Sequence, residues 1–554
     1  MTRDHRFLGW ARAEEGLALA LVLCAGAVLA SAANARVLRV GSYHGIRGPY
    51  HSIQAAVDAA RPGDWILIGP GDYKTRASRR PGGRPDLPAA ILITTPNLWI
   101  RGMNRNTVVV DGTKPGSARC SRSPAAQNLG PASPSGRLGL NGIMVWKADN
   151  VWVQNLTACN FLGGAGDAGN AIWWNGGDGS GTIGGWGFRG AYLSATSTFY
   201  GGPRTAAGYG VFSSDWSGGA WNQIYASNFD DSGLYIGACR QVCNQTVSHA
   251  WSEFNALGYS GSNSGGRLVV EHSRFDHNEL GFVVNSDNDD KPPPQNGTCP
   301  NDAISPITHT HSCWVFTHND VEDNNDADVP GARFGAAGPV GTGVDLTGAR
   351  NDTVMDNEIE SNDAWGVLFV PHPDDGGPCT GGTKDELGPG SCNFDEWGDA
   401  LLGNLFGHNG SYGNPTNGDI AELNFESGHP TDCYRGNTQQ GGGMLETSPS
   451  DLQQANPDCD GSPTPANENP MLLSEILCDA RLSLTGGSPP CLPSDHYPRR
   501  THVIMHPLPH GLVTMPTPCK GVPTNPWCPR RAASRPRSRR EPANLRGRQR
   551  HLGR

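Results

Sequence analysis

The sequence predicts an all-β solenoid that is closed at its N-terminal end by a short helix. Three observations support this prediction: a helix followed at once by a strand near the N-terminus, a short apolar motif that returns along the chain, and a composition rich in turn-forming residues. The 554 residues include 75 glycines and 43 prolines, whereas charged residues make up only 17%. This composition favours many short strands joined by turns over long helices.

Residues 1–35 have the pattern of a secretory signal. Basic residues precede an apolar run from Leu17 to Ala30, and Ala33-Asn34-Ala35 has the small side chains of a cleavage site. A single membrane anchor is the alternative interpretation, because the apolar run is fairly long. We expect a secreted, extracellular protein that does not stay inserted in a membrane once the signal is removed.

The cysteine count also fits export. One of the 15 cysteines lies in the signal, and the remaining 14 form an even set, which suggests disulfides. We expect loops to be stapled by three pairs that lie close together in the sequence: Cys239/Cys243, Cys299/Cys313 and Cys379/Cys392.

Residues 51–73 predict one helix, one tight turn and one strand. Ser52 can cap a helix whose apolar face begins at Ile53. The Pro-Gly pair at 62–63 ends that helix, and Trp65 to Ile68 is a short β-type run. We expect this unit to begin the solenoid.

A motif of Asn or Ser, any residue and an apolar residue then recurs through the middle of the chain. Its apolar anchors are separated by 25, 21, 46, 38 and 47 residues: Phe229, Phe254, Phe275, Val321, Ile359 and Phe406. The first two intervals match single coils of a solenoid, and the longer ones fit two coils or one coil with an inserted loop. A propeller or sandwich is the competing all-β fold, but most Asn-Gly turns here do not lie between paired strands.

The positions three residues after these anchors predict a ladder at one corner of the coil. They are Ser232, Leu257, Asn278, Asn324, Asn362 and Asn409. Asparagine tolerates left-handed backbone geometry and can form hydrogen bonds along a stack, which explains its recurrence.

The helix–turn–strand unit at 52–73 and the two strands within Leu98 to Gly112 resemble the opening of secreted right-handed parallel β-helix proteins, the pectin-lyase-like group. The resemblance implies that fold over roughly Val40 to Glu426, with the helix plugging the first coil. The group includes lyases, hydrolases, esterases and proteins without a known reaction. The sequence motifs of its polygalacturonases and pectin methylesterases are missing here, so the resemblance implies no residue's role.

We therefore divide the chain into four segments: a signal peptide at 1–35, a β-helix domain with long inserted loops at 36–426, a mostly irregular region containing Pro, Ser and Cys at 427–529, and an Arg-rich disordered tail at 530–554. The tail contributes +9 to a formal net charge of −10, which leaves −19 for residues 1–529. We interpret the tail as solvated chain; contact with an anionic polymer is the alternative. The acidic body argues against nucleic acid as a partner.

Because strand side chains alternate, the residue after each anchor should point outward. Those residues are Asp230, Asn255, Asp276, Glu322, Glu360 and Gly407. Outward carboxylates on neighbouring coils stand about 4.8 Å apart, where they could share a Ca²⁺ ion or act as an acid and base pair. A solvated polar ladder without a catalytic role is the alternative interpretation.

These positions give two sets of candidates. Asp230, Asp276 and His277 are the catalytic candidates, and Asp276, Glu322 and Glu360 are the candidate ligands of Ca²⁺. No cofactor follows with certainty from the sequence, and Ca²⁺ is the one candidate. Arg274 and Arg350 are the basic residues that could serve a lyase as a base.

An aromatic cluster in Gly- and Asn-rich sequence gives the candidate substrate-binding residues: Trp173, Trp174, Asn175 and Trp216. Indole rings can stack on the flat face of a sugar while amides bind its hydroxyls. The alternative is that these rings seal loops onto the coil.

The sequence thus predicts a monomeric extracellular β-helix protein that engages polysaccharide. If it is catalytic, we expect a lyase or hydrolase of acidic glycans. A non-catalytic surface or matrix protein that binds glycan, or forms a scaffold, is the alternative function.

Overall fold

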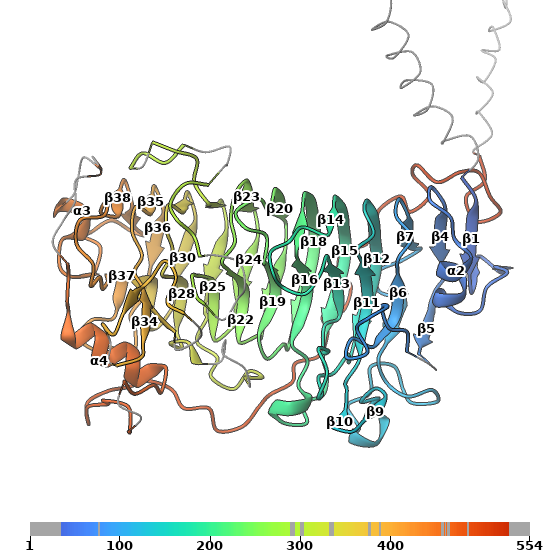
Figure 1. Cartoon of the computed structure of the whole chain (residues 1–554), viewed down its shortest axis with the longest axis horizontal. Coiled ribbons are helices and arrows are strands. Elements are labelled where there is room, and N and C mark those ends of the chain that lie inside the picture. The colour runs from blue at the N-terminus through green and yellow to red at the C-terminus, as the bar shows by residue number, and fades with distance from the viewer. Residues whose placement is uncertain are drawn as a thin grey trace, which may run out of the picture.

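The computed structural model describes residues 35–75, 78–288, 294–299, 304–307, 309–331, 337–374, 378–386, 389–455, 459, 461, 466–484 and 487–530. All but the last residue of the predicted signal segment and all but the first residue of the Arg-rich tail lie outside these residues. The described chain winds as a right-handed parallel β-helix with three walls, as predicted (Figure 1).

The first wall begins at the N-terminal cap and runs the length of the solenoid. Its strands are β1 (Val37–Val40), β4 (Trp65–Ile68), β7 (Trp99–Gly102), β20 (Gln245–Ser248), β23 (Leu268–Glu271), β26 (Trp314–Thr317), β29 (Thr353–Met355), β35 (Ala400–Leu402) and β38 (Cys433–Arg435).

The second wall follows the first after a sharp bend. Its strands are β5 (Gly71–Lys74), β8 (Val108–Asp111), β21 (Trp251–Glu253), β24 (Arg274–Asp276), β27 (Asp320–Glu322), β30 (Glu358–Glu360), β36 (Leu405–Gly407) and β39 (Thr438–Gln439). Three longer strands contribute to both of these walls: β12 (Val151–Cys159), β15 (Phe188–Thr196) and β18 (Gly219–Ser227).

The third wall is a separate sheet of 11 strands. They are β6 (Ala89–Ile93), β11 (Asn141–Trp146), β13 (Ile172–Asn175), β16 (Tyr209–Ser214), β19 (Ser232–Gly237), β22 (Leu257–Ser262), β25 (Leu280–Asn285), β28 (Thr342–Thr347), β31 (Trp365–Val370), β37 (Gly418–Glu422) and β40 (Thr447–Ser448).

The loops between the walls contain four small sheets of two or three strands each. They comprise β2 (Ser42–Tyr43) with β3 (Ile46–Arg47), β9 (Ala132–Ser133) with β10 (Gly136–Arg137), β14 (Gly185–Trp186) with β17 (Trp216–Ser217), and β32 (His372–Asp374) with β33 (Thr383–Lys384) and β34 (Cys392–Phe394). Short 3₁₀ turns occur at Pro124–Ala126 and Pro203–Thr205.

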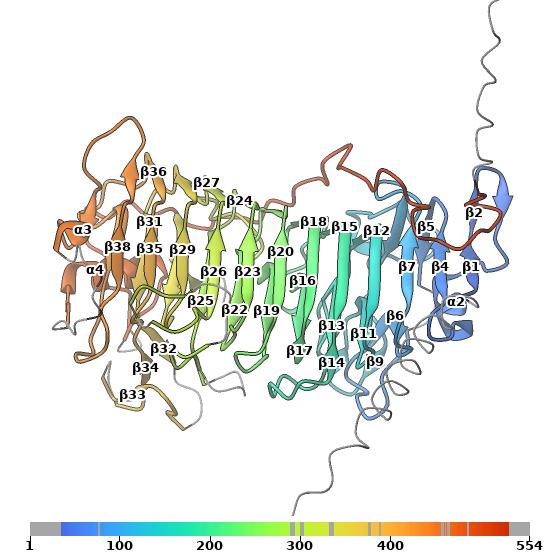
Figure 2. The same ribbon diagram turned by 90° about the horizontal axis from the view of Figure 1, so that it is seen from above.

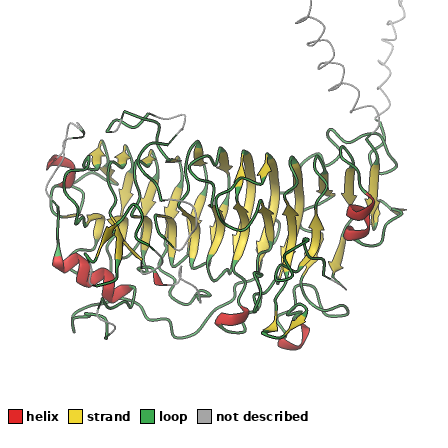
Figure 3. Cartoon of the chain, in the orientation of Figure 1, coloured by secondary structure: helices red, strands yellow, loops and turns green. Residues whose placement is uncertain are grey.

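The N-terminal end is closed by α2 (Ile53–Ala59), as the sequence predicts. The hydroxyl of Ser52 accepts a hydrogen bond from the backbone N–H of Ala55 and so caps the helix. The helix buries Ile53, Ala56 and Val57 against the first coil, which removes these apolar surfaces and the open end of the core from water. Helices lie at both ends of the solenoid (Figure 3).

Between the first two walls, one backbone position per coil has positive φ. The residues that occupy it include Asn155, Tyr192, Gln223, His249, His272, His318, Asp356, Gly403 and Gly436. A left-handed residue bends the chain within one step, so each coil turns from one wall to the next without a loop. Asn, His, Asp and Gly are common here because the left-handed conformation costs these residues least.

The predicted asparagine ladder exists at the corner after the second wall. Asn278 donates its side-chain N–H to the amide oxygen of Asn324 at 3.0 Å. Asn324 repeats this bond to Asn362 at 3.0 Å, and Asn362 to Asn409 at 3.3 Å. Asn255 takes the place that the sequence analysis gave to Leu257, because its amide oxygen and nitrogen both join the stack.

The two N-terminal anchors were therefore assigned in the wrong frame. In the observed register Ser252 pairs with Phe275, so Ser252 points into the core and Glu253 outward. Phe254 lies at the corner with φ of 58°. From Phe275 onward the anchors Phe275, Val321, Ile359 and Phe406 are paired in consecutive coils. The long intervals between them are thus single coils with inserted loops.

The solenoid extends past the predicted boundary at 426, because β38, β39 and β40 continue all three walls. These strands have only two or three residues each, too few to show a periodic apolar pattern. Two helices follow, α3 (Leu452–Ala455) and α4 (Pro470–Asp479).

Residues 498–528, here called the strap, run back along the outside of the solenoid to the N-terminal cap (Figures 1 and 2). The strap is irregular in secondary structure, as predicted for this region, but it is bound to the coil throughout. The stacked rings of His506 and Phe254 hold its middle, and the indole N–H of Trp527 donates to the carbonyl of Ile46 at its end. The sequence of the strap shows no apolar periodicity because the strap is an extended chain that binds the solenoid through individual contacts.

Seven disulfides use all 14 cysteines outside the predicted signal segment. The three predicted local pairs are confirmed, and the other four pairs are Cys120–Cys159, Cys433–Cys459, Cys478–Cys491 and Cys519–Cys528. Among the described residues, no helix combines the length and apolar character needed to cross a membrane.

Candidate functional site

The outer face of the second wall carries two columns of side chains, because residues i and i+2 of each strand point the same way. One column contains Tyr225, Trp251, Arg274, Asp320 and Glu358. The other contains Ser227, Glu253, Asp276, Glu322 and Glu360. We call the surface from Tyr225 to Glu360 the acidic face.

Asp276 lies at the centre of the acidic face and is only 1% exposed. Its carboxylate accepts hydrogen bonds from the indole N–H of Trp251 at 2.7 Å and from Nδ1 of His277 at 2.9 Å. The guanidinium of Arg274 lies 3.0 Å away. The hydrogen bond between His277 and Asp276 is the main reason why the pKa of His277 is raised. The predicted candidates Asp276 and His277 are thus in contact.

Glu253 lies beside Asp276 on the preceding coil and is 5% exposed. The hydroxyl of Tyr225 donates a hydrogen bond of 2.6 Å to its carboxylate. Burial raises the pKa of Glu253 to about 7, although the bond from Tyr225 works in the opposite direction. A carboxyl group in this range can give or take a proton near neutral pH, as acid–base catalysis requires.

An open groove with a volume of about 640 Å³ lies along the bend between the first two walls, next to the column that contains Arg274, Asp320 and Glu358. Its lining includes the imidazoles of His249, His272 and His318, which follow one another along the bend as tilted rings with centroids 5.7 and 5.1 Å apart. Arg274 and Asp320 line the groove from the second wall. The groove therefore offers flat rings and polar groups side by side, in the direction of the solenoid axis.

The acidic face has a strong excess of negative charge. Burial is the main cause of the raised pKa values of Asp320 and Glu322, and neighbouring carboxylates add to it. Arg274 lies between two of these carboxylates, since its guanidinium is also 2.6 Å from Glu322. Protonation or a bound cation would relieve the remaining repulsion.

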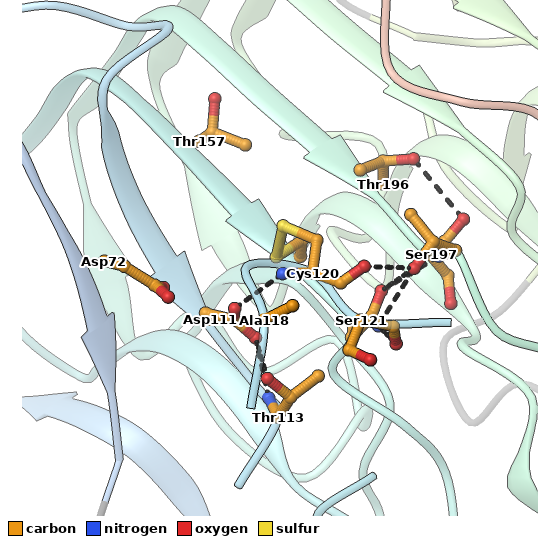
Figure 4. The surroundings of a disulfide bond; sticks show 12 residues. Asp72, Asp111, Thr113, Ala118, Cys120, Ser121, Thr157, Thr196 and Ser197 are labelled. Carbon is orange, nitrogen blue, oxygen red and sulfur yellow. Dashed lines mark hydrogen bonds between the residues drawn. A yellow bond between two sulfur atoms is a disulfide. The ribbon is translucent and has the colours of Figure 1, made fainter. Parts of the chain in front are cut away.

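The N-terminal part of the second wall is covered by an inserted loop. The Cys120–Cys159 disulfide and its loop cover Asp111, whose carboxylate accepts hydrogen bonds from the backbone N–H groups of Thr113 and Cys120 (Figure 4). Lys74 forms an ion pair with Asp111 at 2.5 Å.

The strap covers the next coils. The backbone N–H of His506 donates to the amide oxygen of Asn228, and the carbonyl of Val513 accepts from Arg105. A long ligand on this wall can therefore occupy only the part from Trp251 toward Glu360.

Asp230 does not join Asp276. In the observed register Glu253 pairs with Ser227 of the preceding coil, so Ser227 is the member of the column in that coil. Asp230 lies three residues further along the chain, beyond the corner, and is fully buried. The prediction placed it in the column because Phe229 was aligned with the strand anchors, whereas this buried residue occupies the corner position that Asn255 has in the next coil.

The predicted aromatic platform is not presented to solvent. Trp174 and Trp216 are fully buried in the core, and Asn175 is fully buried as well. Trp173 points away from the core but is 4% exposed and stacks on Phe212 with ring centroids 4.8 Å apart. The alternative interpretation holds for Trp174 and Trp216: the rings fill the coil and hold its inserted loops.

The predicted Ca²⁺ ligands are in neighbouring coils, as expected. Asp276 pairs with Glu322, and Glu322 with Glu360. The guanidinium of Arg274, however, occupies the space between Asp276 and Glu322, where a shared cation would bind. The other basic candidate, Arg350, is buried and donates to backbone carbonyls away from this wall.

The sequence analysis missed Tyr225, Trp251 and Glu253. One signal could have found Glu253: the spacing of 23 residues from Asn255 to Asn278 equals the spacing from Glu253 to Asp276. Aligning coils on the asparagines instead of the apolar anchors gives the correct frame. The contact of Tyr225 with Glu253 has no sequence signal, because it joins different columns on adjacent coils.

No protein-family model and no curated protein matches this chain. Among solved structures, the chain is similar to the A-module of mannuronan C-5 epimerase AlgE4 from Azotobacter vinelandii, with 15% identity, a TM-score of 0.41, and coverage of 70% of this chain and 90% of that one. It is similar to pectate lyase Pel9A with 14% identity and a TM-score of 0.34, over 76% of this chain and 82% of the other. An alginate lyase from Paenibacillus sp. str. FPU-7 has 11% identity and a TM-score of 0.31, over 74% and 98%. Because identities and TM-scores are this low, no residue's role is transferred, and function is argued from the acidic face alone.

Proposed function

We propose that the protein binds a polysaccharide along the acidic face and cleaves it by acid–base catalysis, with Glu253 as the proton donor. The observation that carries this proposal is the pair formed by Glu253, whose pKa is raised to about 7, and the neighbouring Asp276, which three donors surround. Two adjacent carboxyl groups in such different environments suit the separate roles of acid and base or nucleophile.

The negative charge of the acidic face limits which kind of glycan it can bind. Asp320, Glu322, Glu358 and Glu360 outnumber the cation Arg274, so a polyanion would be repelled. Hydrolysis of a neutral or weakly charged glycan therefore fits better than the cleavage of acidic glycans expected from the sequence. An acidic glycan would require a cation such as Ca²⁺ to bridge its carboxylates to the face.

Export is part of the same proposal. Disulfides persist in oxidising compartments, and this chain has seven. An extracellular location would also give the protein access to cell-wall or matrix glycans.

The test is an assay of the purified protein against neutral and uronate-containing polysaccharides, with and without Ca²⁺. New reducing ends without unsaturated products indicate hydrolysis, and unsaturated products indicate a lyase. Glu253→Gln should lower the rate by at least about 100-fold. Glu271→Gln, a carboxylate on the outside of the first wall in the next coil, is the matched control and should leave the rate unchanged. Equal rates in both variants would rule out Glu253 as the proton donor.

A non-catalytic glycan-binding protein is the second candidate. The observation that favours it is the burial of the proposed reacting pair, since Glu253 and Asp276 are 5% and 1% exposed. Binding to a glycan without any released product, in the assay above, would support this function over catalysis.

A further inference from the structure

A second cluster of carboxylates lies outside the acidic face, where the chain turns from the third wall to the first near the C-terminal end. Glu422 ends β37, Asp432 directly precedes β38, and Glu396 belongs to the segment that leads into β35. One carboxylate oxygen from each of these three residues lies within 4.8 Å of the others. Three segments thus bring negative groups to one point.

Glu396 is the unusual member of this cluster. It is fully buried, and among the described residues no other side chain or backbone group forms a hydrogen bond with either carboxylate oxygen. Asn424 lies next to it, since its side-chain N–H donates to the carbonyl of Glu396 at 3.1 Å. The amide oxygen of Asn424 is also buried and has no hydrogen-bond partner among the described residues. Buried polar atoms are rarely left in this state.

Nearby donors do not supply the missing charge. Arg350 interacts electrostatically with Glu396, but its guanidinium donates to the backbone carbonyls of Asp395, Gln295 and Gly381. Tyr434 donates to Glu422 at 2.8 Å, which satisfies one oxygen of one carboxylate. Buried charges are costly unless they are paired or coordinate a metal.

We propose that Glu396, Glu422 and Asp432, with the amide oxygen of Asn424, bind a Ca²⁺ ion that fastens the last coils of the solenoid. Ca²⁺ accepts six to eight oxygen ligands at about 2.3–2.6 Å, so ligands on opposite sides of one ion lie about 4.8 Å apart. The ligand set contains only oxygen, which favours Ca²⁺ over Zn²⁺. Ca²⁺ also fits better than Mg²⁺, because Mg²⁺ usually keeps several waters and is rarely held by a cage of protein ligands alone.

The position explains what such an ion would do. It would tie β37 of the third wall to β38 of the first wall and to the inserted segment before β35, beside the Cys433–Cys459 disulfide. The competing explanation is a cluster of neutral carboxylic acids, since burial raises the pKa values of Glu396 and Asp432 well above normal. The two explanations differ in their response to Ca²⁺.

The experiment uses the full exported chain. Metal content is measured by mass spectrometry in protein purified without chelators, and thermal unfolding is followed after EDTA treatment and during titration with Ca²⁺. We expect a single equivalent of Ca²⁺ and a saturable rise of several degrees in the unfolding midpoint, because a ligand that binds only the folded state stabilises it. No bound metal, together with a midpoint that neither EDTA nor Ca²⁺ moves, would overturn the proposal.

Variants locate the ion. Glu396→Gln should abolish the response, and Glu396→Asp, which keeps the charge, should weaken Ca²⁺ binding in calorimetry even if the glutamine variant fails to fold. Asp345→Asn removes a buried carboxyl group on β28 of the third wall and should retain the full response. Binding that is lost in Glu322→Gln and kept in Glu396→Gln would place the ion on the acidic face and contradict this assignment.

Discussion

Arg500 of the strap donates a hydrogen bond to the carboxylate of Glu279, which lies 221 residues earlier in the chain at the corner after the second wall. Glu279 is only 3% exposed, and burial raises its pKa to about 8 in spite of this partner. The guanidinium also donates to the carbonyl oxygens of Ala327 and Gly331. The strap thus supplies the hydrogen-bond donor of a buried carboxyl group in the solenoid.

Removing this partner should destabilise the protein. Arg500→Met removes the hydrogen-bond donor of the buried Glu279 carboxyl group and of two carbonyl oxygens, and leaving these groups without their partner should cost about 3 kcal/mol of unfolding free energy. Arg499→Met, the exposed neighbour on the same segment, should change the free energy by less than about 0.5 kcal/mol. Denaturant unfolding of the two variants measures the difference; equal values would mean that the strap does not support the coil.

Trp174 provides a test of core packing against substrate binding. Its ring is fully buried, and its indole N–H donates to the carbonyl of Val151 at 3.3 Å. Trp174→Ala should lower the unfolding free energy by about 4 kcal/mol, because it removes a large buried side chain and leaves a cavity.

The matched control is Trp186→Ala, since Trp186 belongs to the insertion after β13 and is 56% exposed. This variant should unfold like the wild type in the same denaturant titration. If instead Trp174→Ala keeps its stability and loses glycan binding, the original prediction of a substrate platform would be restored.

The sequence predicted the fold through features that depend on local chemistry. The cap of α2 is visible because Ser52 and the apolar face of the helix are adjacent in the chain. The ladder from Asn278 to Asn409 is visible because few side chains can both accept and donate hydrogen bonds along a stack of coils. The left-handed conformation expected for these asparagines belongs instead to the residue before each of them, such as His277 and Asp323. Neither the helix cap nor the ladder depends on which side chains lie on the opposite wall of the coil.

The site was predicted only in part, for the opposite reason. Asp276, His277 and Glu322 were found because strand alternation fixes which side chains point outward. Glu253 and Asp230 depended on the register between coils, and a shift in the assigned anchor changes which residue joins the column. The burial of Trp174 and the docking of the strap depend on contacts between distant segments, which leave no periodic trace.

The asparagine ladder should be a large source of stability. Asn324 donates to the carbonyl of Phe275 and to Asn362, and its oxygen accepts from the backbone and side-chain N–H groups of Asn278. Asn324→Ala would leave several of these buried groups without partners, at a total cost of about 3 kcal/mol. Asn325→Ala, the half-buried neighbour that makes fewer bonds, should cost about 1 kcal/mol or less. Similar losses in both variants, measured by denaturant unfolding, would contradict a special role for the ladder.

The stability of the folded protein should depend on pH through the ionisation of Glu253. In the folded state its pKa is about 7, against 4.5 for an unperturbed glutamate. Below pH 4.5 the carboxyl group is protonated in both states and does not affect stability. Between these values the unfolded state releases its proton while the folded state keeps it, so stability falls as pH rises and levels off above about 7. Glu253→Gln should therefore gain stability relative to the wild type across this interval.

The same proton governs the proposed reaction. A proton donor acts only while it is protonated, so kcat/KM should fall as pH rises through about 7. Tyr225→Phe removes a hydrogen bond that lowers the pKa of Glu253, and the falling limb should move to higher pH because the carboxylate loses its stabilising donor. A variant that merely disturbs the fold would lower the rate at every pH without moving the limb. Direct NMR titration of the Glu253 carboxyl carbon in the wild type and in Tyr225→Phe should show the same upward displacement, and a shift to lower pH would show that Tyr225 does not stabilise the ionised form.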